Sequence, residues 1–250
     1  MQLKNLITDA NRELYKRVTE NLPIQFKKSN NNSWGSNKEE KRIIISHCET
    51  NHPEASFTHE LLHIDTQMQG YRRLRSGLSL NSAVLEQLPF LCEMIDNEFQ
   101  HHKMYSKFLQ LGYPPHEFYN DADAQADQYV SNGIEAKGQS LTSITSIYFT
   151  LIAPGGSIPS ERIATLKNEF RKYDQGAFRE RFDDIDKIIH AWTVDSTYHA
   201  ERHIIDVLNV LGCGDTWVSY FHNAENFPQD GFFTTRTFTI DDINKAYASK

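Results

Sequence analysis

The chain has 250 residues, of which 39% are hydrophobic and 24% are charged, and its formal net charge at pH 7 is −7. This composition is typical of a globular protein, and the acidic balance argues against a nucleic-acid binder that relies on a general basic surface. No apolar run approaches the roughly 18 residues that span a membrane, and the three scattered cysteines form no disulfide framework. We therefore expect a cytoplasmic protein without a membrane partner.

The first fifth of the chain predicts one helix and two strands. Residues 2–20 have the apolar spacing of an amphipathic helix, and residues 23–26 begin a short strand. The polar segment 28–41 is typical of a long hairpin loop, and the β-branched run at 42–46 predicts a second strand. We expect these strands to form a small antiparallel sheet.

The next helix carries the most informative motif. An asparagine cap at Asn51 and a proline two residues later mark its start, and it ends near Gly70. Within it lies the segment His59-Glu60-Leu61-Leu62-His63. Histidines four residues apart share one face of a helix, so both imidazoles can bind the same Zn²⁺. The glutamate between them can then act as general base on a metal-bound water.

A catalytic zinc site needs a third protein ligand, and the helix predicted at 83–111, with Pro89 as a potential break, offers two candidates. Glu98 lies in the middle of the apolar stripe of this helix, where an unpaired carboxylate is costly unless it is protonated, paired or bound to metal. His101 lies one turn away on the same face and is the alternative ligand. A third interpretation is a buried ion pair of Glu98 with His101 or His102 and no metal.

The order of these elements resembles the core of the minimal gluzincin metallopeptidases, which the ImmA/IrrE-type peptidases share with the thermolysin superfamily. The resemblance covers about residues 1–112 and is most specific at His59, Glu60 and His63. The pair Asn97-Glu98 is similar to the Asn-Glu of thermolysin-like ligand helices. This chain departs from that pattern by having two histidines where a further acid would follow.

The resemblance also implies a substrate and a way of binding it. The strand residues Ile43, Ile44 and Ile45 would form the edge strand that pairs with an extended peptide. A peptide or protein substrate is therefore expected.

Beyond residue 112 the pattern is mostly helical. The segment Pro154-Gly155-Gly156-Ser157 is the clearest break, and it divides an expected metallopeptidase core, residues 1–153, from a helical region, residues 154–250, that packs on it. A weak strand at 232–239 and a short helix from Asp241 close the chain. The other helices are predicted at 122–132, 140–151, 160–174, 177–192 and 195–211. The expected class is α+β, mostly helical, with the small sheet next to the motif helix.

Four residues outside the first histidine pair are weighed for a role at the site. His199 and His203 repeat the four-residue spacing, and a structural or surface role competes with an active-site role in which they or Tyr198 stabilise an oxyanion. Asp65 is either solvated or supports His63 by a hydrogen bond.

The leading hypothesis is a zinc-dependent hydrolase, specifically a metallopeptidase. One zinc ion per chain would be held by His59, His63 and Glu98, and Glu60 would be the general base. One alternative is a metal-binding regulatory protein that binds a partner without turnover. Another is a di-metal carboxylate oxidoreductase that uses Glu98 and His101.

Overall fold

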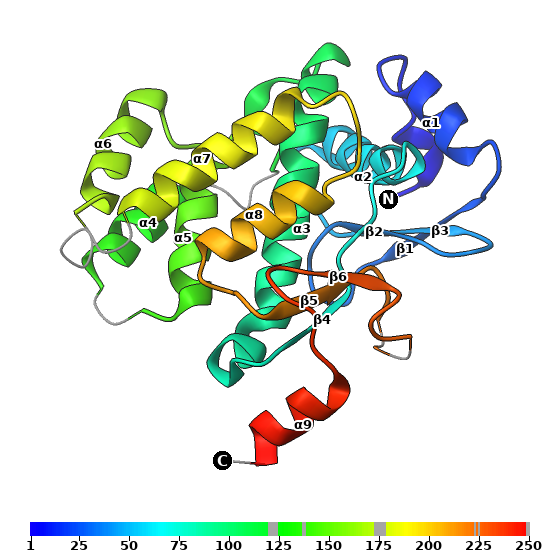
Figure 1. Cartoon of the computed structure of the whole chain (residues 1–250). Coiled ribbons are helices and arrows are strands. Elements are labelled where there is room, and N and C mark those ends of the chain that lie inside the picture. Colours follow the sequence, from blue (N-terminus) through cyan, green and yellow to red (C-terminus); the bar gives the residue numbers. More distant parts are fainter. Residues whose placement is uncertain (120–124, 137–138, 173–178, 223, 225, 249–250) are drawn as a thin grey trace. The chain divides into compact units, whose positions relative to one another are not determined.

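The computed structural model describes residues 1–119, 125–136, 139–172, 179–222, 224 and 226–248 (Figure 1). Contacts within the chain divide it into two units. Unit 1 comprises Met1–Tyr71, Gln100–Asp127 and Ala153–Ile158, and unit 2 comprises Arg72–Phe99, Gln128–Ile152 and Pro159–Lys250. The expected boundary between residues 153 and 154 stays a prediction.

The expected fold class is confirmed. The described residues form a mixed α+β protein that is mostly helical, with two small sheets and a helical C-terminal region. Within the described residues, no helix combines the length and the apolar character that crossing a membrane requires.

The sheet of unit 1 has the strand order β1-β3-β2. The first strand, β1 (Ile24–Lys28), runs parallel to β3 (Ile43–His47), whereas β2 (Gly35–Lys38) runs antiparallel to β3. The expected hairpin between the first and last of these strands is therefore wrong. The segment expected to be its loop contains β2, so the hairpin is formed by β2 and β3, and the sheet is mixed.

The central position of β3 also corrects the expected substrate strand. Ile43 is paired with Ile24 of β1 and with Lys38 of β2, and Ile44 and Ile45 likewise have partners on both sides. A strand that is hydrogen-bonded along both edges cannot add an extended peptide. The edges of this sheet are β1 and β2 instead.

The motif helix, α2 (Pro53–Met68), contacts this sheet at β2 (Figure 1). Its N-cap is His52, one residue after the expected asparagine, and Pro53 occupies the first turn, where its missing N–H costs nothing. The chain leaves the helix at Gly70, whose φ of 112° is a conformation that favours glycine. The apolar residues that pack α2 in unit 1 are Ile43, Ile45, Phe57, Leu61, Leu62, Ile64, Met104, Phe108 and Phe118.

Because α2 is buried on every side from Ala55 to Thr66, its polar side chains need partners inside the protein. Asn11 Nδ2 donates a hydrogen bond of 2.9 Å to Thr58 Oγ1. Arg17 Nε donates one of 2.8 Å to the Asp65 carboxylate, which Lys107 also approaches. Asp65 is thus buried rather than solvated, and its ion pair with Arg17 links α2 to the N-terminal helix α1 (Arg12–Thr19).

Residues 2–20 do not form the single helix that their spacing predicts. They form a short 3-10 helix, η1 (Leu3–Asn5), and α1 (Arg12–Thr19). Between them, the backbone N–H of Thr8 donates to Asn11 Oδ1 at 2.9 Å, and Asn11 Nδ2 donates to the Leu6 carbonyl at 2.9 Å. Such local side-chain bonds compete with helical hydrogen bonds and explain the break.

The second long helix, α3 (Ser82–Gln110), is continuous through Pro89 and is followed by the 3-10 helix η2 (Pro115–Glu117). Its residues up to Phe99 belong to unit 2, and those from Gln100 onward belong to unit 1.

Unit 2 contains an antiparallel sheet with the order β4-β5-β6. The sequence does not predict β4 (Ser76–Ser79) or β5 (Thr216–Ser219), and β6 (Gly231–Phe233) covers only the start of the strand expected at 232–239. The remaining helices are α4 (Ala126–Glu135), α5 (Leu141–Ile152), α6 (Ser160–Phe170), α7 (Arg179–Val194), α8 (Glu201–Val210) and α9 (Ile240–Ala248).

One predicted helix of unit 2 needs a correction. The helix expected at 195–211 begins only at Glu201, because the Asp195 carboxylate accepts a hydrogen bond of 2.7 Å from the backbone N–H of Thr197 and holds a turn there. Parts of three other predicted helices, residues 122–124, 173–174 and 177–178, lie outside the described residues.

Candidate metal centre

Three buried histidines of unit 1 form a group that can hold a metal ion. His59 and His63 lie one turn apart on α2, so the helix presents both rings on the same face. His101 comes from the part of α3 that belongs to the same unit. The structure thus joins the predicted helix pair to the alternative third ligand.

The nitrogen atoms converge at the spacing that a tetrahedral ion requires. The Nε2 atom of His59 lies 3.1 Å from Nε2 of His63 and 3.2 Å from Nε2 of His101. Two nitrogens bound to a tetrahedral zinc ion lie about 3.3 Å apart, since each Zn–N bond is about 2.05 Å. Two of the three nitrogen pairs are thus at the spacing of zinc ligands, and all three ligand atoms lie within 4.8 Å of one another.

The outer nitrogen of one ring is directed by a hydrogen bond. His63 Nδ1 lies 3.1 Å from Gln100 Oε1, and because an amide oxygen can only accept, His63 Nδ1 is the donor. The outer nitrogen of His59, Nδ1, is buried and has no hydrogen-bond partner among the described residues. A ring that donates from Nδ1 carries a lone pair on Nε2. The His63 lone pair therefore faces His59 Nε2, 3.1 Å away, and either a metal ion or a proton on His59 Nε2 fits between the two atoms.

The lowered pKa values of two of these rings favour the binding of a metal ion over protonation. Burial lowers the pKa of His59 well below its ordinary value of 6.5, and the neighbouring His63 acts in the same direction. Burial likewise lowers the pKa of His101, and His59 and His63 add to the shift. The rings are consequently neutral at pH 7, which is the form that binds metals.

Two aromatic residues that the sequence analysis did not single out enclose the cluster. The Phe118 ring centroid lies 4.6 Å from that of His59, and the Tyr119 centroid lies 5.0 Å from that of His101. They directly follow η2, a segment that looked like an ordinary turn. Gln100 was also missed, because an amide next to a histidine has no distinctive spacing. Its proximity to His63 appears only when α2 and α3 are placed together.

The two carboxylates predicted to act at the site, Glu60 and Glu98, lie at different places relative to the three histidines. Glu60 is buried on α2 between the two helix ligands. Glu98 is buried on α3 but is not a member of the three-histidine group. Its role as a ligand stays a prediction.

The second pair of histidines does not lie on a common helix. His199 and Tyr198 precede α8, and His203 lies on it. In unit 2, His203 Nε2 is 3.4 Å from the Asp195 carboxylate, and its ring packs against Trp192. These contacts give His203 a structural role. The expected part of all three residues in stabilising an oxyanion stays a prediction.

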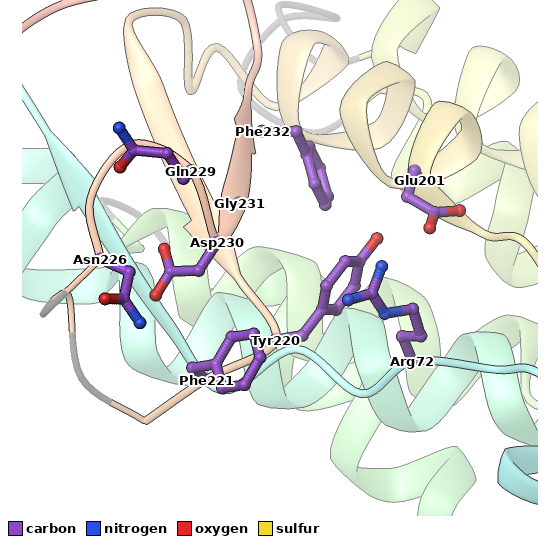
Figure 2. Close-up of a pocket in the computed structure, with 9 residues that line it drawn as sticks. All are labelled: Arg72, Glu201, Tyr220, Phe221, Asn226, Gln229, Asp230, Gly231 and Phe232. Carbon is purple, nitrogen blue, oxygen red and sulfur yellow. The ribbon is translucent and has the colours of Figure 1, made fainter.

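Unit 2 has a cavity of about 640 Å³ at the end of β5 and the turn before β6 (Figure 2). The Arg72 guanidinium lies over the Tyr220 ring, 4.2 Å from its centroid. Burial raises the pKa of Tyr220, and the Glu201 carboxylate acts in the same direction. Among the described residues no metal-binding group lies at this cavity, so the histidine cluster of unit 1 remains the stronger candidate site.

The chemistry of the cluster has to be inferred from its own geometry, because no family model, curated protein or solved structure matches this chain. Its three buried imidazoles, two of which have pKa values well below 6.5, can bind a metal ion. A buried three-histidine group able to hold a metal is therefore the functional feature that this chain shows.

Proposed function

We propose that this chain is a zinc-dependent hydrolase, specifically a metallopeptidase of the gluzincin type, with one zinc ion per chain. The observation that carries the proposal is that His101 Nε2 of α3 lies 3.2 Å from His59 Nε2, which lies 3.1 Å from His63 Nε2. His59 and His63 are on α2, the helix that also carries Glu60. A catalytic zinc site has three protein ligands and an open fourth position. With His101 as third ligand, the site departs from the gluzincin pattern, in which an acid has that place.

The donor set supports zinc over a pair of iron or manganese ions. Di-metal carboxylate sites are built mainly from glutamates, whereas the group gathered here consists of imidazoles. Imidazole nitrogens at tetrahedral spacing suit zinc. The di-metal oxidoreductase is therefore the weaker alternative.

A bound zinc ion would act as a Lewis acid that lowers the pKa of water and polarises a carbonyl. The other roles belong to residues of the chain. Glu60 takes the proton from the attacking water at its carboxylate and delivers it to the leaving amine. Gln100 holds the His63 ring in place through Nδ1. Phe118 and Tyr119 cover the histidines with apolar surface and limit the access of bulk water.

We propose a peptide or protein as substrate and the cytoplasm as location. The location is supported by the three cysteines, Cys48, Cys92 and Cys213, which are all free thiols.

Glu60→Gln tests the catalytic part of the proposal. The amide keeps the shape of the side chain but cannot accept a proton, so hydrolysis of a fluorescence-quenched peptide library should fall by about 10²–10⁴-fold. Zinc content, measured by elemental analysis, should equal that of the wild type. Glu54→Gln is the matched control, because Glu54 is exposed on the first turn of the same helix.

Activity of Glu60→Gln within about tenfold of the wild type would rule Glu60 out as the base. A wild-type protein that binds zinc but cleaves neither the library nor casein would support the regulatory alternative.

The ligand assignment is tested by comparing His101→Ala with Glu98→Ala. We expect His101→Ala to lose zinc, because it removes one of three ligands, and Glu98→Ala to keep it. His102→Ala is the control for a histidine on the same helix outside the cluster. Zinc retained by His101→Ala and lost by Glu98→Ala would show that the carboxylate is the third ligand. Circular dichroism checks that each variant is folded.

A further inference from the structure

A second group of metal-binding side chains lies in unit 1, apart from the histidine triad. It consists of His52, which precedes α2, and of His116 and Glu117 in η2. One ligand atom from each residue lies within 4.8 Å of the others. His52 Nδ1 is 3.1 Å from Glu117 Oε1, and the rings of His52 and His116 have centroids 5.8 Å apart.

We infer that His52, His116 and Glu117 form a second zinc site. Two imidazoles and one carboxylate are a common three-ligand set for zinc, with water in the fourth position. The His52–Glu117 separation of 3.1 Å already matches the roughly 3.3 Å between two ligands of a tetrahedral ion. His116 is exposed, so a change of its side-chain torsion can bring its ring into place without moving the backbone.

The surroundings make this site weaker than the triad. The side chains of His52 and Glu117 are 31% and 21% exposed, so water and other ions compete for them. The group also lies at the N-terminus of α2, where the helix dipole opposes a cation. The carboxylates of Glu117 and of Glu54 in the first turn partly offset this effect. We expect the triad to fill first and this site to take a second, weaker equivalent of zinc.

The position of the site gives the metal a structural effect. His52 is the residue from which α2 starts, and Glu117 directly precedes Phe118 and Tyr119, whose rings pack against the triad. An ion shared by these residues ties η2 to the start of α2. It therefore restrains the backbone that holds the aromatic cover in place.

Zinc titration of the untagged, chelator-treated protein tests this inference. Isothermal calorimetry should resolve a tight and a weak binding event in the wild type. The double variant His116→Ala, Glu117→Gln should lose only the weak event, and the double variant His59→Ala, His101→Ala should lose only the tight one. His190→Ala is the control, because His190 is an exposed histidine on α7 outside both groups. The calorimetric titrations thus distinguish the loss of the triad site from the loss of the second site.

Hydrogen exchange gives a second readout that does not depend on activity. The second equivalent of zinc should slow amide exchange in peptides that cover residues 113–119, and it should not do so in His116→Ala, Glu117→Gln. A wild type that binds a single equivalent would overturn the inference. A weak event that survives in the double variant, or unchanged exchange at 113–119 on the second equivalent, would also overturn it.

Discussion

Two segments of this chain place histidines four residues apart, and their surroundings differ in ways that separate a candidate metal site from a structural contact. His59 and His63 lie within α2, and both rings are buried. His199 precedes α8, so only His203 of the second pair is helical. The four-residue spacing brings two side chains onto one face only where a continuous helix contains both.

The hydrogen bonds of the two pairs differ as well. His63 uses its outer nitrogen, Nδ1, for Gln100, and this leaves Nε2 directed at His59. His203 directs Nε2 at the Asp195 carboxylate. A third donor, His101, completes only the first pair. Three features therefore distinguish the His59/His63 pair from the His199/His203 pair. They are a continuous helix, the direction of the His63 Nε2 atom toward His59 and a third histidine from another element.

The sharpest test of this comparison is His63→Ala against His203→Ala. We expect His63→Ala to weaken zinc binding by more than about 100-fold, the upper end of what the loss of a supporting partner costs, since a ligand itself is removed. His203→Ala should leave affinity unchanged, because its ring contacts Asp195 and Trp192. A competition assay with a zinc-binding dye measures both. Equal losses in the two variants would contradict the distinction drawn between the pairs.

A smaller effect is expected from Gln100→Ala. Loss of the hydrogen bond to Nδ1 leaves the His63 ring free to turn, so zinc affinity should fall by about 10–100-fold. Gln67→Ala is the matched control, because Gln67 Nε2 donates to the backbone carbonyl of His63 rather than to its ring. If both variants bind zinc like the wild type, orientation by Gln100 does not matter.

The weakest expected effect concerns the pH dependence of the metal-free protein. The folded-state pKa values of His59 and His101 lie below their ordinary value of 6.5, so below about pH 6.5 the unfolded chain binds protons that the folded chain does not. The free energy of unfolding should therefore fall as the pH is lowered from 7 to 5. Thermal denaturation in the presence of a chelator measures this fall, and it should be smaller in His101→Leu. An equally steep fall in His101→Leu would count against this cause.

The pairing of His59 with His63 on one helix face could be predicted from sequence, whereas the third member of the histidine group could not be chosen. Spacing, Pro53 and Gly70 are local signals, and they place His59 and His63 on one helix face. Glu98 and His101 share the apolar stripe of α3. The stripe shows which face of the helix is buried, but it does not show which unit each part of that face packs in. The part up to Phe99 belongs to unit 2, and the part from Gln100 belongs to unit 1. The sequence pattern does not show at which residue α3 passes from one unit to the other.

The sheets show a similar limit. The run Ile43-Ile44-Ile45 has strong β propensity and forms the expected strand. By contrast, β2 and β4 have the sequences Gly-Ser-Asn-Lys and Ser-Gly-Leu-Ser, which are typical of loops. Their partners across the sheet make them strands, and that information is not local. The missed β2 also explains why the parallel pairing of β1 with β3 was not expected.

The amide of Gln100 has a consequence for charge. Imidazole and amide side chains carry no negative charge, so a divalent ion held by the three histidines, with Gln100 against His63, would keep both of its positive charges. A carboxylate ligand would cancel one of them. In the proposed reaction, peptide hydrolysis ends with a new carboxylate next to the ion, and a buried ion with two positive charges attracts that anion strongly. Release of the acid product, rather than bond cleavage, would then limit turnover.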